Sequence, residues 1–265
     1  MRVQVRAAAR AALAPPVVRR RWAGVVALAV LASTGACARG DARGDAGAAA
    51  TSAATTTTNG SRSTPDGAPG ARRGTILFVG TSLTAGLGLD PDSAFPALIA
   101  RKLDSAGYHY DVVNAGVSGE TSAGALRRID WLLRQPFDVL VLETGANDGL
   151  RGQSVDAMRR NIEALLDRVR QARPGATLVL VQMEALPNFG SRYTAAFHNV
   201  FPEVAQKYHV TLAPFLLAGV AGKPELNQPD GIHPNLAGER IVADNLWRSL
   251  EPVLRARDPG PGTRD

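Results

Sequence analysis

Short, continuous apolar runs alternate with longer segments of helical periodicity from residue 75 onward. Such runs are typical of strands that are covered on both faces, as in a parallel sheet between two layers of helices. Strict alternation of the two patterns predicts an α/β fold, here a three-layer α/β/α sandwich with a five-stranded parallel sheet. Ser154 and Asn235 are expected to cap the helices that they precede. The expected strands are 76–79, 110–113, 139–142, 178–181 and 210–213, and the expected helices are 94–106, 121–134, 153–172, 193–207 and 235–254.

The first 73 residues differ from the rest of the chain in charge. They contain 11 Arg, no Lys and three Asp, a net charge of +8, whereas the whole chain carries +6. Residues 74–265 therefore carry −2, and the high pI gives no electrostatic reason to expect nucleic acid as a partner. The length suits one well-buried domain over 74–254, which we expect to be a monomer, followed by a disordered tail over 255–265.

Residues 1–38 have the pattern of an export signal, because arginines precede an apolar run that is followed by small residues. Cys37, the only cysteine, allows two interpretations. Thr34-Gly-Ala-Cys37 resembles a bacterial lipobox, with Thr where Leu is usual, and would give a lipoprotein tethered to the membrane. Small residues on both sides of Cys37 fit cleavage that releases the protein into the periplasm instead. Residues 39–73, rich in Ala, Gly, Ser, Thr and Pro, are predicted to form a flexible linker.

Small and polar residues follow the predicted strands at the point where each strand ends. Gly80-Thr-Ser82 follows the first strand, Asn114-Ala-Gly116 the second, and Gly145-Ala-Asn147 the third, while Asp230-Gly-Ile-His233 precedes the last helix. In open α/β sheets, sites form outside the carboxyl ends of the strands. These residues are therefore expected to gather at one edge of the sheet.

The residue types in these loops fit acyl transfer. A serine hydroxyl needs a base to take its proton, and the base needs a third group that fixes its tautomer. We assign Ser82 as the nucleophile, His233 as the general base and Asp230 as the orienting carboxylate. Alone, the Asp230–His233 pair could equally be a helix cap beside a surface histidine. The oxyanion would be stabilised by the N–H groups of Ser82 and Gly116 and by the side-chain amide of Asn147.

The four segments resemble, in order, the four sequence blocks of the SGNH (GDSL) hydrolases, and most of all their bacterial periplasmic arylesterase/thioesterase/lysophospholipase branch. The resemblance covers nearly all of residues 75–252. It implies a flavodoxin-like sandwich and hydrolysis of esters or thioesters without a metal or cofactor, with the same roles for the residues named above. The family usually has Asp immediately before the serine, where this chain has Thr81.

The expected function is therefore that of an exported serine esterase acting on a small ester or lipid. Leu150, Phe189 and Phe215 are the candidate substrate-binding residues, and core packing is the alternative for each of them. Two other functions stay open: a polysaccharide deacetylase of the same fold, and a binding module for lipids or glycans with a relic site. The low aromatic content, 5%, offers little stacking surface for sugars.

Overall fold

A computed structural model describes residues 73–258 and places five parallel strands in one sheet of order β2-β1-β3-β4-β5. The predicted α/β fold with a five-stranded parallel sheet is confirmed. The strand bounds are β1 Gly74–Gly80, β2 Tyr110–Gly116, β3 Val139–Leu142, β4 Thr177–Val181 and β5 Thr211–Ala213.

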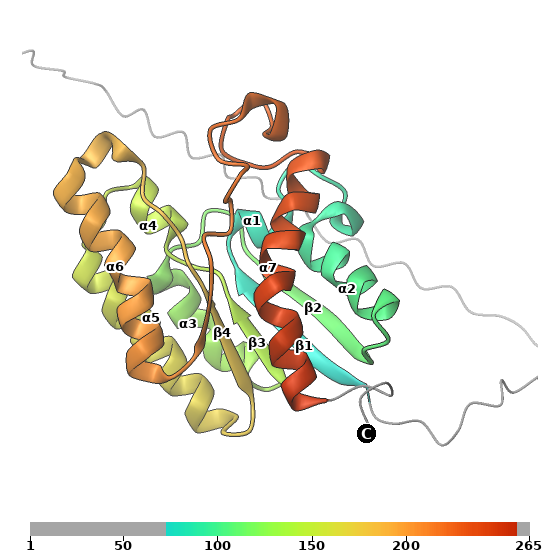
Figure 1. The fold of residues 1–265 in the computed structure, drawn as a ribbon. Helices are drawn as coiled ribbons and strands as arrows, with labels where there is room; N and C mark the ends of the chain where they lie inside the picture. Colours follow the sequence, from blue (N-terminus) through green and yellow to red (C-terminus); the bar gives the residue numbers. More distant parts are fainter. Residues whose placement is uncertain (1–72, 259–265) are drawn as a thin grey trace, which may run out of the picture. The chain divides into compact units, whose positions relative to one another are not determined.

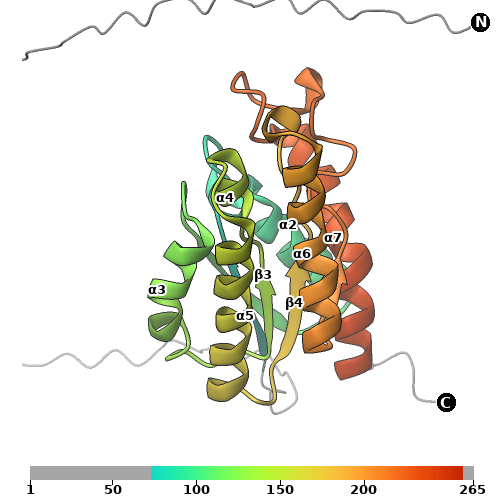
Figure 2. The same ribbon diagram turned by 90° about the vertical axis from the view of Figure 1, so that its left-hand side faces the viewer.

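Helices cover both faces of the sheet: α2 and α7 pack together on one face, while α3, α5 and α6 lie side by side on the other (Figures 1 and 2). Two short helices, α1 and α4, start at strand ends. The helices are α1 Ser82–Ala85, α2 Phe95–Ser105, α3 Ser122–Leu132, α4 Ala146–Leu150, α5 Val155–Ala172, α6 Ser191–Tyr208 and α7 Leu236–Arg257, with 3₁₀ turns at Pro91–Ser93, Pro187–Phe189 and Pro224–Leu226.

The apolar runs in the sequence are continuous because helices cover both faces of the sheet. Every residue of β3 is buried, because the strand lies at the centre of the sheet between two helical layers. By contrast β2 is an edge strand, and Val113 on it is 45% exposed. Its apolar run has the composition of a covered strand, but only one of its sides has a neighbouring strand.

Element boundaries differ from the prediction where pairing or capping extends an element. The strands β1 and β2 pair over seven residues each, from Gly74 with Tyr110 to Gly80 with Gly116. Both strands are therefore longer than the apolar runs that predicted them. The helix α7 continues to Arg257, three residues beyond the predicted end of the domain. Ser154 and Asn235 cap α5 and α7 as predicted, since their side-chain oxygens accept backbone N–H groups.

The predicted export signal, the Cys37 lipidation site, almost all of the linker and the last seven residues of the tail lie outside the described residues. Between residues 73 and 258, no helix is both long enough and apolar enough to cross a membrane.

A buried carboxyl group joins the two helices that cover one face. Glu239 of α7 is 2% exposed, and its Oε2 accepts the N–H of Phe95 at 2.7 Å, at the start of α2. This contact replaces a local cap, because Ala94 in the N-cap position has no side chain able to accept. Burial raises the pKa of Glu239 from its ordinary 4.5 to about 8, against the opposing effect of the Phe95 N–H.

Replacing Glu239 with glutamine is expected to stabilise the fold in alkaline solution. Because the pKa is higher in the folded state, the stability that Glu239 provides is complete below about pH 4.5 and is lost as the pH rises through about 8. A neutral amide still accepts from Phe95 without that loss. We expect Glu239→Gln to raise the free energy of unfolding by about 2 to 4 kcal/mol at pH 8, and by much less at pH 5. Urea titrations at both pH values measure this, with the exposed Glu225→Gln as control; equal gains at both pH values would contradict the explanation.

Candidate active site

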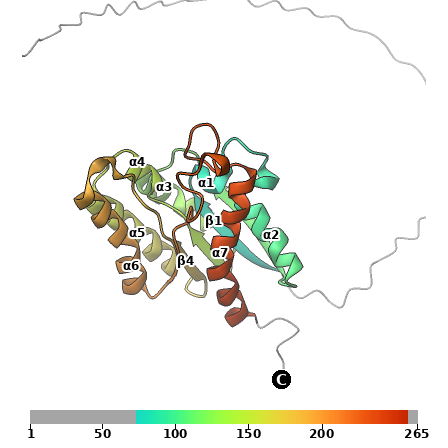
Figure 3. The ribbon, with the colours of Figure 1, turned by 45° about the horizontal axis from the view of Figure 1, so that its top comes forward.

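The nucleophile candidate sits on a tight turn at the carboxyl end of β1. Thr81 is the N-cap of α1, Ser82 is its first residue, and Gly86 ends the helix with a φ of 69°. As the first residue of a helix, Ser82 has an N–H with no acceptor inside the helix, so this donor is available to a ligand. Figure 3 shows α1, α4 and the segment before α7 at the same edge of the sheet.

The structure brings Ser82, His233 and Asp230 together although 151 residues separate the serine from the histidine. His233 Nε2 lies 2.8 Å from Ser82 Oγ, and His233 Nδ1 lies 2.6 Å from Asp230 Oδ2. The alternative of a surface histidine beside a helix cap does not fit, because the cap of α7 is Asn235. The three groups therefore form a continuous hydrogen-bonded line from carboxylate to hydroxyl.

The local turn keeps Asp230 ionised. Its Oδ1 accepts the backbone N–H groups of His233 at 3.0 Å and Ile232 at 2.9 Å. The His233 backbone N–H, the His233 side chain and the Ile232 N–H together lower the pKa of Asp230 from 3.8 to about 2. An ionised carboxylate can only accept, so Nδ1 must carry the proton, and Nε2 is left to accept from the serine hydroxyl.

The oxyanion donors are placed only partly as predicted. Asn147 lies on α4, lines the same pocket as Ser82, and donates its Nδ2 to the carbonyl of Glu120 at 2.9 Å. The Gly116 N–H is not free, because it donates to Asn114 Oδ1 at 2.9 Å. Gly116 also packs under the backbone of α1, where a Cβ would lie 2.3 Å from the Ala85 nitrogen. The geometry thus disfavours Gly116 as a donor and gives a packing reason for its lack of a side chain.

Gly119 is a better-placed donor that the sequence analysis does not predict. It is exposed in the loop after β2, with a φ of 75°, beside the Glu120 carbonyl to which Asn147 is bound. Its own carbonyl accepts from Arg151 Nη2 at 3.0 Å, and among residues 73–258 its N–H has no acceptor. The available signal was the second glycine of the Gly116-to-Glu120 segment, just before the Thr121 cap of α3.

A largely apolar pocket of about 310 Å³ opens beside Ser82 and His233. Leu150 and Phe215 line it as predicted, but Phe189 does not. The Phe189 ring instead packs on Tyr193, with ring centroids 5.3 Å apart, and over Gly152. The lining also includes the apolar side chains of Leu83, Met183, Leu186, Leu217 and Ile232. A hydrocarbon chain fits these walls better than a polyhydroxylated ring.

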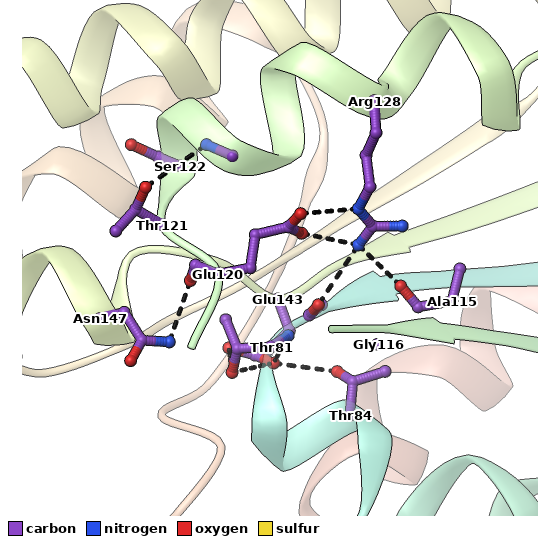
Figure 4. Close-up of polar contacts among 12 residues, drawn as sticks. Thr81, Thr84, Ala115, Gly116, Glu120, Thr121, Ser122, Arg128, Glu143 and Asn147 are labelled. Carbon is purple, nitrogen blue, oxygen red and sulfur yellow. Dashed lines mark hydrogen bonds and ion pairs between the residues drawn. The ribbon is translucent and has the colours of Figure 1, made fainter. Parts of the chain in front are cut away.

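Thr81 binds a buried carboxyl group directly beneath the nucleophile turn (Figure 4). Glu143, at the end of β3, is 1% exposed and accepts the Thr81 N–H at 2.7 Å. The hydroxyls of Thr81 and Thr84 each lie 2.9 Å from Glu143 Oε2. Burial raises the pKa of Glu143, and the threonine donors act in the opposite direction. An aspartate at position 81 would set a second carboxyl group against Glu143, whereas the threonine hydroxyl donates to it.

Removing the Thr81 hydroxyl is expected to destabilise the domain. Thr81→Val keeps the shape of the side chain but deprives the buried Glu143 of a donor and the Leu83 N–H of its cap acceptor. Together these losses cost about 1 to 3 kcal/mol of the free energy of unfolding. Thr144→Val is a matched control, because the Thr144 hydroxyl is buried with no hydrogen-bond partner among the described residues. Urea denaturation of both variants should show the loss for Thr81→Val only. Equal losses would show that Glu143 does not depend on the hydroxyl.

A Ser-His-Asp line at the carboxyl edge of a parallel α/β sheet, next to an apolar pocket, defines a serine hydrolase. In the part of the chain between residues 73 and 258, His, Cys, Asp and Glu side chains form no group of three or more suited to holding a metal ion.

Comparison with known proteins narrows this class to a family. Residues 78–241 match the model of the GDSL-like Lipase/Acylhydrolase family, and the chain belongs to that family, within the SGNH hydrolase superfamily. It is accordingly a carboxylic ester hydrolase.

The similar proteins are esterases and thioesterases by name. Esterase TesA of Pseudomonas aeruginosa is 41% identical over 181 residues, which cover 68% of this chain and 89% of that protein. Thioesterase 1/protease 1/lysophospholipase L1 of Escherichia coli K12 is 38% identical, covering 68% and 85%. Among solved structures, the esterase EstA of Pseudoalteromonas sp., inhibited by monoethylphosphonate, is 36% identical with a TM-score of 0.65, covering 68% of this chain and 98% of that one.

Proposed function

We propose that this protein is an exported serine esterase that cleaves carboxylic esters or thioesters of short to medium acyl chains, lysophospholipids included, through an acyl-enzyme on Ser82. The observation that carries the proposal is the line from Asp230 through His233 to Ser82, with distances of 2.6 and 2.8 Å, at the mouth of an apolar pocket.

The reaction follows from these contacts. As Ser82 Oγ attacks the substrate carbonyl carbon, its proton moves to His233 Nε2, and Asp230 stabilises the resulting imidazolium. The oxyanion is held by the Ser82 N–H, the Asn147 amide and the Gly119 N–H. His233 then gives the proton to the departing alkoxide or thiolate, which leaves Ser82 acylated. A water molecule, deprotonated by His233, hydrolyses the acyl-enzyme and releases the acid.

The shape of the pocket supports an acyl chain as the part of the substrate that is buried. Leu150, Phe215 and Leu186 provide apolar wall area, and Glu184 is the only acidic side chain of the lining. The inhibition of EstA by a phosphonate is what a serine nucleophile would produce, because a phosphonate can form a tetrahedral adduct. Neither feature favours a polysaccharide as substrate.

A series of p-nitrophenyl esters of graded acyl length tests this proposal. We expect kcat/KM to be highest for a chain short enough for the pocket of about 310 Å³ and to decline for longer chains. In Leu186→Trp the optimum should shift to shorter chains, while exposed Leu236→Trp, which does not line the pocket, should leave it unchanged. An optimum that stays in place in Leu186→Trp would contradict burial of the acyl chain in this pocket.

Export and lipidation form a separate part of the proposal, supported by the arginine-led apolar run and by Cys37. Fractionation of cells expressing the full chain and its Cys37→Ala variant tests it. A lipoprotein would sediment with membranes and lose this property in Cys37→Ala; a released enzyme would be recovered in the periplasm in both cases. Retention of the uncleaved chain in the cytoplasm would contradict export.

A further inference from the structure

An ion pair next to the site connects the two strand ends that carry the nucleophile and the oxyanion loop. Arg128 of α3 binds Glu120 through two parallel hydrogen bonds, Nε to Oε1 at 2.7 Å and Nη2 to Oε2 at 2.6 Å. The two side chains are only 22% and 8% exposed. Arg128 is thus partly buried, whereas the preceding residue on the same helix, Arg127, is exposed.

The guanidinium also reaches the sheet (Figure 4). Arg128 Nη2 lies 2.7 Å from the carbonyl of Ala115 in β2 and 3.4 Å from the carbonyl of Gly80, the last residue of β1. Gly80 belongs to the same peptide unit as the Thr81 N–H that is bound to Glu143. A single cation therefore ties the loop after β2 to the ends of both strands.

The contacts continue from Glu120 to the catalytic machinery. The Glu120 carbonyl accepts the side-chain amide of Asn147 at 2.9 Å, which sets the orientation of that amide. The Glu120 stem is itself confined, because a Cβ on Gly124 would lie 2.7 Å from Glu120 Cγ. Because the Glu120 side chain is held at its carboxylate by Arg128 and at its Cγ by Gly124, the backbone carbonyl of Glu120 has little freedom to move.

We infer that the Glu120–Arg128 pair is a positioning device for the oxyanion site: it fixes the Glu120 carbonyl, and through it the amide of Asn147, relative to Ser82. The inference rests on the proposed acyl-enzyme function. Oxyanion donors act through preorganisation, so a displaced amide lowers kcat more than it changes KM. Glu120 and Arg128 are positioning residues and do not contact the reacting atoms.

The expected effects on kcat differ between Arg128 and Arg127, its neighbour on the same helix. Glu120→Gln and Arg128→Gln should each lower kcat about 10-fold with KM changed less than about 3-fold. Arg128→Lys, which retains the charge but not the two-pronged geometry, should recover part of the loss. Arg127→Gln, the matched control, should keep wild-type kcat.

Coupling to Asn147 distinguishes positioning from general support of the fold. Asn147→Ala should lower kcat by about 10²-fold. If Glu120 acts through that amide, adding Glu120→Gln to Asn147→Ala should cost less than about 2-fold further. A purely structural role would give the same 10-fold loss in both backgrounds, along with a lower urea midpoint.

The decisive experiment measures kcat and KM on a p-nitrophenyl ester for these variants, with urea midpoints to establish the folded fraction. Non-additivity of Glu120→Gln and Asn147→Ala, with Arg127→Gln unchanged, would support the inference. Additive losses, or wild-type kcat in Glu120→Gln, would overturn it while leaving Ser82 chemistry intact. Ser82→Ala is run alongside, because full activity in that variant would refute the proposed function instead.

Discussion

Ser82→Ala is expected to lower kcat on any ester substrate by about 10⁴- to 10⁶-fold, with the fold unchanged. Among residues 73–258, the Ser82 hydroxyl is the only nucleophile hydrogen-bonded to His233 Nε2, and without it no acyl-enzyme can form there. The substitution should be tolerated structurally, because Ser82 Oγ bonds only to His233 within residues 73–258, while Thr81, Glu143 and the α1 backbone still hold the turn.

Covalent labelling provides the independent readout for Ser82. A fluorophosphonate should phosphonylate Ser82 with loss of fluoride, which adds the mass of the phosphonyl group to the peptide containing Ser82 in the wild type and leaves Ser82→Ala unmodified. Ser105→Ala, an exposed serine at the end of α2, serves as control and should label and turn over as the wild type does. Full esterase activity in Ser82→Ala, or labelling at another serine, would rule out the proposed mechanism.

Asp230→Asn is expected to lower kcat by about 10³- to 10⁴-fold. The asparagine oxygen can still accept the backbone N–H groups of Ile232 and His233, so the turn should persist. Its amide nitrogen would face Nδ1, however, and as a donor it would favour the imidazole tautomer that protonates Nε2. In that tautomer His233 cannot take the proton of Ser82.

The pH dependence checks the same assignment. Because the pKa of Asp230 is lowered to about 2, the carboxylate stays ionised well below neutrality, so its own protonation does not cause a loss of activity between pH 8 and 5. We expect kcat/KM of the wild type to fall as the pH decreases over this range, because an imidazolium cannot take the proton of Ser82. The exposed Asp156→Asn is the control and should retain wild-type kcat. A flat profile over this range would exclude a histidine base.

The sequence was sufficient for the features that depend on local pattern. Continuous apolar runs predicted all five strands, because two helical layers require buried residues on both faces of a sheet. The gathering of Ser82, Asn147 and the Asp230–His233 turn at one edge followed from the rule that the carboxyl ends of parallel strands share an edge.

Features that depend on tertiary contacts could not be predicted in this way. Gly116 and Gly119 are three residues apart, and only the backbone conformation shows that the first N–H is bound to Asn114 while the second is free within the described residues. Its position after a strand end predicts that Phe189 lines the pocket, but its ring packs on Tyr193, four residues later, instead. Helical periodicity likewise could not reveal that Arg128 reaches the ends of two strands.

Asp230 and His233 lie on the same turn, closed by Gly231 with a φ of 69° and by backbone bonds to Asp230 Oδ1. A displacement of this turn therefore moves base and carboxylate as one body. The separation of Nε2 from Ser82 Oγ can change while the tautomer is preserved, so thermal motion of the turn would interrupt proton transfer without disassembling the pair. The histidine would be correctly protonated whenever the turn returns to the serine.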